Sequence, residues 1–83
     1  MGIEDINNIV IQTGFKINKL IEDYSNEIDL IKKKKLKDNI YSNCFFLYHC
    51  CSKLYSSTKI NSLEKDTRDM ATILNNFDKI FII

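Results

Sequence analysis

The chain has 83 residues, of which 45% are hydrophobic and 28% charged, and its formal net charge is +1. This length permits one domain at most, and the balance of apolar and charged residues favours folding over disorder. The absence of proline and the presence of only two glycines argue against an all-β fold and exclude the glycine-rich loops that cradle phosphates. The near-zero charge gives no indication of a nucleic-acid partner or an anionic membrane.

Apolar residues recur at heptad spacing through residues 3–31 and predict the first helix. The inward positions are Ile3, Ile6, Val10, Thr13, Ile17, Leu20, Tyr24, Glu27 and Ile31. Glu4 and Asp5 suit the N-terminal turn of such a helix, because its dipole favours negative charge there. Gly14 lies inside the pattern and costs about 1 kcal/mol relative to alanine in a helix interior.

The segment Lys32–Asp38 interrupts the pattern with four adjacent lysines that repel one another. We expect it to form the solvated connection to the next helix, with Asp38 or Asn39 as that helix's N-cap. The alternative is a docking site for an acidic partner.

The second predicted helix, residues 39–56, is apolar on more than one face. Ile40, Leu47 and Leu54 repeat every seven residues, and a tyrosine follows each of them at positions 41, 48 and 55. A helix with more than one apolar face is central in its domain, or it buries one face internally and another against a partner.

The third predicted helix covers residues 61–81. Asn61 and Glu64 have the spacing of an N-cap and its capping-box carboxylate, and Glu64 and Arg68 have the spacing of an ion pair on one helix face. The inward positions are Ile60, Leu63, Thr67, Met70, Leu74, Phe77 and Phe81. Three helices with short connections predict an all-α fold, an elongated antiparallel three-helix bundle with coiled-coil-like packing that forms one domain over residues 1–83.

The cysteines and the single histidine give little support for a metal site or a catalytic site. Cys44 and Cys51 share one face of the second helix, Cys50 is rotated away from it, and His49 points elsewhere. No second histidine or cysteine pair completes a zinc site, so ordinary buried thiols are the expected state. His49 and Cys50 diverge as neighbours on a helix and do not form a nucleophile–base pair. We expect no enzymatic activity, no metal and no cofactor.

Exposed apolar residues are more informative about function. Ile11 and Phe15 lie four residues apart at outer heptad positions, where they either touch the end of a neighbouring helix or contact a partner protein. Arg68 with Asn75 and Asn76 is too sparse for a DNA-recognition helix. The odd cysteine count and the lack of a secretory signal favour a reducing, cytoplasmic environment.

Two stretches resemble the tubulin-folding cofactor A family. The first is Ile11-Gln12-Thr13-Gly14 followed by Lys19-Leu20-Ile21-Glu22, which is similar to the start of the family's first helix. The second is Leu63-Glu64, Asp69-Met70 and Ile73-Leu74, which is similar in spacing to its third helix. The family fold is an elongated three-helix bundle, which agrees with the fold that the heptads predict.

The resemblance implies a small chaperone that captures β-tubulin folding intermediates by protein–protein contact, as a monomer or homodimer associated with the cytoskeleton. It implies no nucleotide or metal, and we expect neither a nucleic-acid nor a membrane partner. The outer faces of the helices would then bind tubulin through Phe15, Lys19, Glu22, Asp23, Lys65, Arg68 and Asp69. The alternative is a small helical coiled-coil subunit or adaptor of another multiprotein assembly. A third possibility is a virus- or parasite-encoded regulator that masks a host helix.

Overall fold

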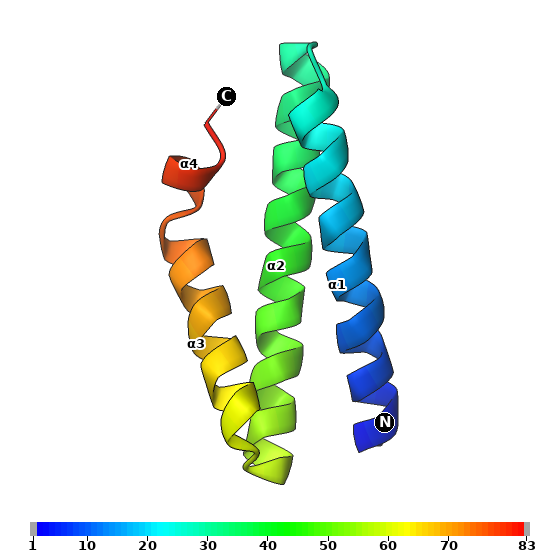
Figure 1. Cartoon of the computed structure of the whole chain (residues 1–83), viewed down its shortest axis with the longest axis vertical. Coiled ribbons are helices and arrows are strands. Elements are labelled where there is room, and N and C mark those ends of the chain that lie inside the picture. The colour runs from blue at the N-terminus through cyan, green and yellow to red at the C-terminus, as the bar shows by residue number, and fades with distance from the viewer. Residues whose placement is uncertain (1, 83) are drawn as a thin grey trace.

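The computed structural model describes residues 2–82, apart from the side chains of Ile3 and Asn61. It contains three long helices, α1 (Ile3–Asn26), α2 (Leu30–Thr58) and α3 (Asn61–Asn75), and one short helix, α4 (Phe77–Ile80). Each long helix runs antiparallel to the one before it, so that α1 and α3 are parallel, in a rod of 42 × 22 × 15 Å (Figure 1). The described residues form no strand. The predicted all-α, elongated three-helix bundle is therefore confirmed.

The heptad pattern of α1 is confirmed as far as Tyr24. Ile6, Thr13, Ile17 and Tyr24 are all buried, which are four of the predicted inward positions. At its N-terminus the backbone N–H of Gly2 donates to Oδ2 of Asp5 at 3.3 Å, so a carboxylate in the first turn supports the helix end as expected.

The predicted position of the first connection was wrong. Residues 32–38 lie inside α2, and the connection is Glu27–Asp29. Two carboxylates build this turn: Oε1 of Glu27 accepts from the backbone N–H groups of Ile28 and Asp29, both at 3.1 Å. Oδ1 of Asp29 accepts from the N–H groups of Ile31 at 2.8 Å and Lys32 at 3.2 Å. Asp29 is thus the N-cap of α2, in place of Asp38 or Asn39.

The lysine run is helical because it has an inner face of its own. Leu36 packs against the core, and Nζ of Lys37 lies 3.1 Å from Oδ1 of Asp78. Nζ of Lys33 lies 4.7 Å from the centroid of the Tyr24 ring, a cation–π contact. Lysine is also a good helix former, so charge repulsion alone does not break the helix. Ile31, predicted as an inward residue of the first helix, is instead 71% exposed on α2.

This arrangement predicts unequal effects of removing two aspartates. Asp29→Ala should lower the free energy of unfolding by about 1 kcal/mol, because two N–H groups at the start of α2 lose their acceptor. Asp38→Ala is the matched control at an exposed position inside the helix, and it should leave stability unchanged or slightly raised. Urea titrations followed by circular dichroism measure both. A larger loss for Asp38→Ala would contradict the position of the connection.

Helix α2 is the centre of the molecule and packs along both α1 and α3 (Figure 1). Its inner face buries Ile40, Cys44, Cys51 and Leu54, of which Ile40 has no exposed surface. The central position expected from its apolar character is therefore observed. Within the described residues, no helix combines the length and the hydropathy needed to cross a bilayer.

The third predicted helix is interrupted near its C-terminus, so its prediction as one helix to residue 81 was wrong. Helix α3 begins at Asn61 with Ile60 as N-cap, not Asn61, and it ends at Asn75. The N–H of Asn76 donates to the carbonyls of Thr72 at 3.2 Å and Ile73 at 3.3 Å, and its side chain donates to the Thr72 carbonyl at 2.9 Å. Asn76 thereby satisfies carbonyls at the helix end and turns the chain.

The turn brings the last aromatic residues onto the core. The Phe77 ring lies edge-on to Tyr41 at 4.9 Å and the Phe81 ring edge-on to Tyr24 at 5.4 Å, measured between centroids. Both phenylalanines are buried, and the Tyr24 hydroxyl donates to the carbonyl of Ile82 at 2.6 Å. The segment after α3 is therefore fastened to α2 through Phe77 and to the end of α1 through Phe81 and one hydrogen bond.

Candidate protein-binding groove

An open groove lies between α1 and α3, with α2 as its floor. It consists of two adjoining hollows of about 390 Å³ and 380 Å³. Gly14 and Asn18 of α1, Leu47 of α2 and Met70 of α3 line both of them. Helices α1 and α3 lie on either side of α2, and the extensive helix interfaces are those of α2 with each of them (Figure 1).

Gly14 opens the middle of this groove. A Cβ atom added there would meet no atom within 4 Å outside its own helix surroundings. Val10 and Met70, both predicted as inward residues, are only half-buried, and so is Leu47. Their apolar surface is therefore available to a side chain from outside the molecule.

The groove combines apolar walls with one acidic side. Asp66 and Asp69 line it from α3, and Phe15, whose side chain is 70% exposed, lines it from α1. Ile73 and Phe81 extend the apolar lining toward the C-terminal segment. Such a surface can accept an apolar face of a helix or extended segment, and the aspartates favour a basic residue at its edge.

The structure brings two of the seven predicted partner-binding residues together. Phe15 and Asp69, from different helices, line the same hollow. Among the described residues lining the groove, the other five do not appear: Lys19, Glu22, Asp23, Lys65 and Arg68.

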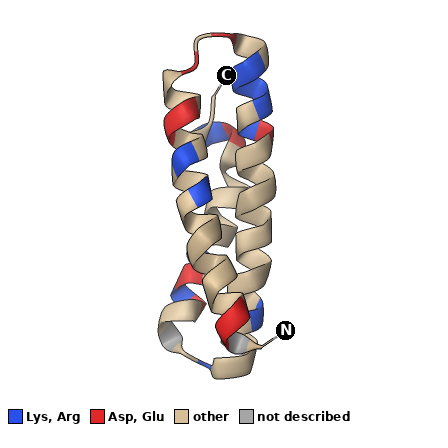
Figure 2. Cartoon of the chain, turned by 90° about the vertical axis from the view of Figure 1, so that its right-hand side faces the viewer, with Lys and Arg blue, Asp and Glu red and all other residues tan. Residues whose placement is uncertain are grey.

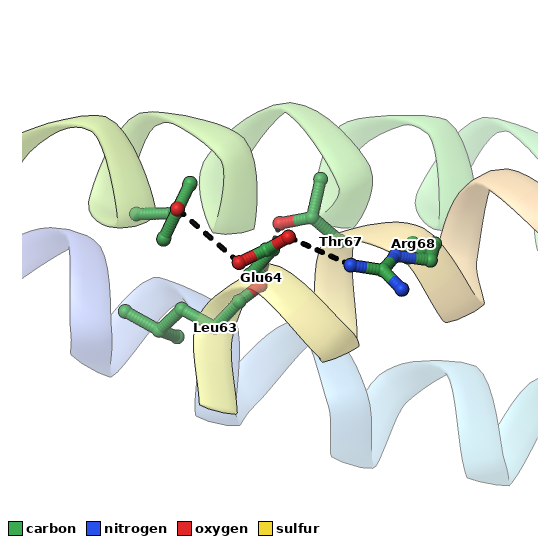
Figure 3. Close-up of polar contacts among 5 residues, drawn as sticks. Leu63, Glu64, Thr67 and Arg68 are labelled. Carbon is green, nitrogen blue, oxygen red and sulfur yellow. Dashed lines mark hydrogen bonds and ion pairs between the residues drawn. The ribbon is translucent and has the colours of Figure 1, made fainter. Parts of the chain in front are cut away.

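These five residues lie on the surface of α1 and α3. Lys19 and Asp23 pair with each other at 3.3 Å, and Arg68 pairs with Glu64 at 2.7 Å, the ion pair predicted from its spacing (Figure 3). Glu64 also accepts from the Tyr55 hydroxyl at 3.3 Å, which ties α3 to α2. Glu22 and Lys65 are exposed. Exposed pairs of this kind contribute little to stability.

Sequence reasoning missed most of the groove, because its residues occupy inward heptad positions. Val10 and Met70 belong to the predicted seams of α1 and α3, and such positions are normally covered. The available signals were Gly14, which leaves a stretch of α1 without a side chain, and the exposed pair Ile11 and Phe15, which both line the groove.

Burial disfavours the thiolate form of all three cysteines, of which Cys44 and Cys51 line the groove. Burial raises the pKa of Cys44, and burial together with the nearby Asp66 carboxylate raises the pKa of Cys51. Burial also raises the pKa of Cys50, although Lys53 opposes the shift. Cys44 and Cys51 are buried and Cys50 is half-buried, as expected for two thiols sharing the inner face.

We predict that an aromatic disulfide reagent at pH 7 modifies Cys50 first and Cys44 and Cys51 at least about ten-fold more slowly, since the thiolate is the reactive form. Cys50→Ser should remove the fast phase. Equal rates for all three thiols in the folded chain would contradict the burial.

The raised thiol pKa values also predict how stability depends on pH. Because folding holds these pKa values above those of the unfolded chain, the free energy of unfolding should be constant at neutral pH and fall as the pH rises through the region of the thiol pKa values.

Within residues 2–82, excluding the side chains of Ile3 and Asn61, no group of three histidine, cysteine or carboxylate side chains is placed to hold a metal ion. No protein-family model, curated protein or solved structure matches this chain. The groove combines an apolar lining with the carboxylates of Asp66 and Asp69 at its edge.

Proposed function

We propose that this chain is a helical protein-binding module that holds an apolar segment of a partner in the groove between α1 and α3. The observation that carries the proposal is the open apolar groove itself, in which Gly14, Leu47 and Met70 leave apolar surface uncovered. The exposed Phe15 on one side and Asp69 on the other supply an aromatic contact and a charge for orientation.

As the specific partner we propose a β-tubulin folding intermediate, with the chain acting as a tubulin-folding cofactor at the cytoskeleton. The choice of tubulin rests on the resemblance of residues 11–22 and 63–74 to the tubulin-folding cofactor A family. The groove fits a chaperone role, because a folding intermediate exposes apolar segments that its native state buries.

The direct experiment mixes the purified chain with β-tubulin released from chaperonin and separates the products by size. The proposal predicts a stable 1:1 complex. The absence of a complex at micromolar concentrations would refute the tubulin assignment. Capture of other unfolded polypeptides with equal affinity would refute its specificity and leave a general binding groove.

Gly14→Leu tests the groove with a variant whose loss of partner binding could not be explained by unfolding. The leucine should raise the free energy of unfolding by about 0.8 kcal/mol, because glycine is a poor residue in a helix interior and the added side chain has room. It should also fill the groove and weaken partner capture at least ten-fold. Gln12→Leu, at an exposed position on the same helix, is the matched control and should leave capture unchanged. Unimpaired capture by Gly14→Leu would place the binding surface elsewhere.

The alternative function, a subunit or adaptor of another helical assembly, is favoured by the outer face of α2. Tyr41, Phe45 and Phe46 are 43%, 48% and 49% exposed, and Phe45 stacks on Tyr41 and lies edge-on to His49. Aromatic residues of this kind are enriched at protein interfaces. In sedimentation equilibrium, a stable assembly larger than a dimer that is lost on Phe45→Ser would favour the alternative, because the folding cofactor is expected to be a monomer or homodimer.

A further inference from the structure

The end of the rod where α1 joins α2 carries three exposed aliphatic side chains. Ile28 in the connection is 92% exposed, and Leu30 and Ile31 at the start of α2 are 65% and 71% exposed. The backbone of this turn is held firmly by the Glu27 and Asp29 carboxylates. The aliphatic side chains are thus presented on a fixed support. We call Ile28, Leu30 and Ile31 the aliphatic tip.

A cluster of lysines follows the aliphatic tip directly. Lys32, Lys34 and Lys35 are exposed. Figure 2 shows blue basic positions in the first turns of α2, at the end of the rod where red acidic positions also lie. The two carboxylates of the connection already accept backbone hydrogen bonds, whereas the three lysine side chains are open to solvent. Asp29 is the only acidic residue between Ile28 and Asp38.

We propose that the aliphatic tip and Lys32, Lys34 and Lys35 form a docking site for the anionic surface of a lipid bilayer. The aliphatic side chains would enter the interfacial region, and the lysines would pair with anionic headgroups around them. Apolar insertion combined with lysine attraction is the general basis of peripheral membrane binding, and each lysine near an anionic surface contributes about five-fold in affinity.

The composition of the site favours a bilayer over a protein or nucleic-acid partner. Lysine is depleted at protein interfaces and leucine is under-represented among their energetic hot spots. Residues 27–37 contain no aromatic residue and no arginine, which are the groups that stack on unpaired bases. The aliphatic tip lies at one end of the long axis of the rod (Figure 1).

This inference departs from the expectation of no membrane partner, which rested on the near-zero net charge and the lack of a spanning segment. A surface contact requires neither of these, because it depends on the local distribution of charge. It uses the end of the rod and is independent of the groove, so either proposal can fail without the other.

The experiment measures co-sedimentation of the full chain with vesicles of phosphatidylcholine alone and with about 30% phosphatidylserine. We expect binding only to the anionic vesicles, weakening as salt increases. Lys32→Gln/Lys34→Gln/Lys35→Gln should weaken binding at least ten-fold. The control Lys16→Gln/Lys53→Gln/Lys65→Gln removes the same charge from exposed positions elsewhere and should lose much less. Absence of binding to anionic vesicles, or equal losses in the two variants, would overturn the proposal.

A fluorescent reporter separates insertion from simple charge attraction. The chain has no tryptophan, so Ile28→Trp introduces one probe in the aliphatic tip. Ile60→Trp introduces one at the opposite end, in the connection between α2 and α3, where Ile60 is 51% exposed (Figure 1). Brominated lipid should quench the fluorescence of the Ile28→Trp variant but not that of the Ile60→Trp variant. Quenching of both or neither, or tighter binding to polyglutamate or RNA than to vesicles, would overturn the proposal and assign the lysines to an acidic protein or a nucleic acid.

Discussion

Ile40→Ala should destabilise the chain by about 3 kcal/mol. Ile40 has no exposed surface and lies in the core cluster with Ile17, Cys44 and Phe77. Truncating a buried isoleucine removes its transfer free energy and leaves a cavity, which together cost about 2–5 kcal/mol. Small domains have total stabilities of about 5–15 kcal/mol, so this single change removes a large share. Urea unfolding followed by circular dichroism measures the loss.

Ile31→Ala is the matched control for that experiment. It makes the same substitution in the same helix, but Ile31 is 71% exposed, so the expected change is within about 0.5 kcal/mol. The pair also tests where the first connection lies. If Ile31 belonged to the inner face of the first helix, as its heptad spacing suggests, the two substitutions would have similar effects.

The fold class could be predicted from the sequence because three long apolar repeats agree with one architecture. The predicted inward positions Ile6, Thr13, Ile17 and Tyr24 of α1 are buried, and so are Ile40 and Leu54 of the seven-residue repeat in α2. These predictions succeed because burying an apolar stripe is the main driving force for helix packing, and the stripe is visible in the spacing of residues.

The first connection could not be placed by the same reasoning. A run of four lysines gives the strongest local signal for a solvated turn, yet the turn is made by Glu27 and Asp29 through hydrogen bonds to backbone N–H groups. The heptad pattern continues across this turn to Ile31 by coincidence of spacing. Leu36, which continues the inner face of α2 toward its N-terminus, was the residue that could have corrected the boundary.

The groove was hidden for a different reason. Spacing shows which residues face inward, but it does not show whether a neighbouring helix reaches them. Val10 and Met70 face inward and remain half-covered, because α2 separates α1 from α3 along this stretch. Phe15 was identified correctly as an exposed aromatic residue, but its relation to Asp69 across the groove depends on the packing of α1 and α3 against α2.

Phe81→Ala should cost about 3 kcal/mol or more, the second large effect that we predict. Phe81 is buried, and its ring contacts those of Tyr24 at 5.4 Å and Phe77 at 4.6 Å between centroids. Truncating a buried phenylalanine costs about 3–5 kcal/mol. Because this residue docks the segment after α3 onto α1, its loss should also increase amide exchange in residues 77–82.

Two further variants divide that effect into its parts. Ile82→Ala changes the next residue, which is 73% exposed, and keeps the carbonyl that the Tyr24 hydroxyl contacts at 2.6 Å, so stability should change by less than about 0.5 kcal/mol. Tyr24→Phe removes only the hydrogen bond and should cost about 1 kcal/mol. If Phe81→Ala and Ile82→Ala were equivalent, the C-terminal segment would not be docked. If the segment is docked, the loss of stability should be largest for Phe81→Ala, smaller for Tyr24→Phe and smallest for Ile82→Ala. This order follows because burial of a ring contributes more than one hydrogen bond, and an exposed aliphatic side chain contributes least.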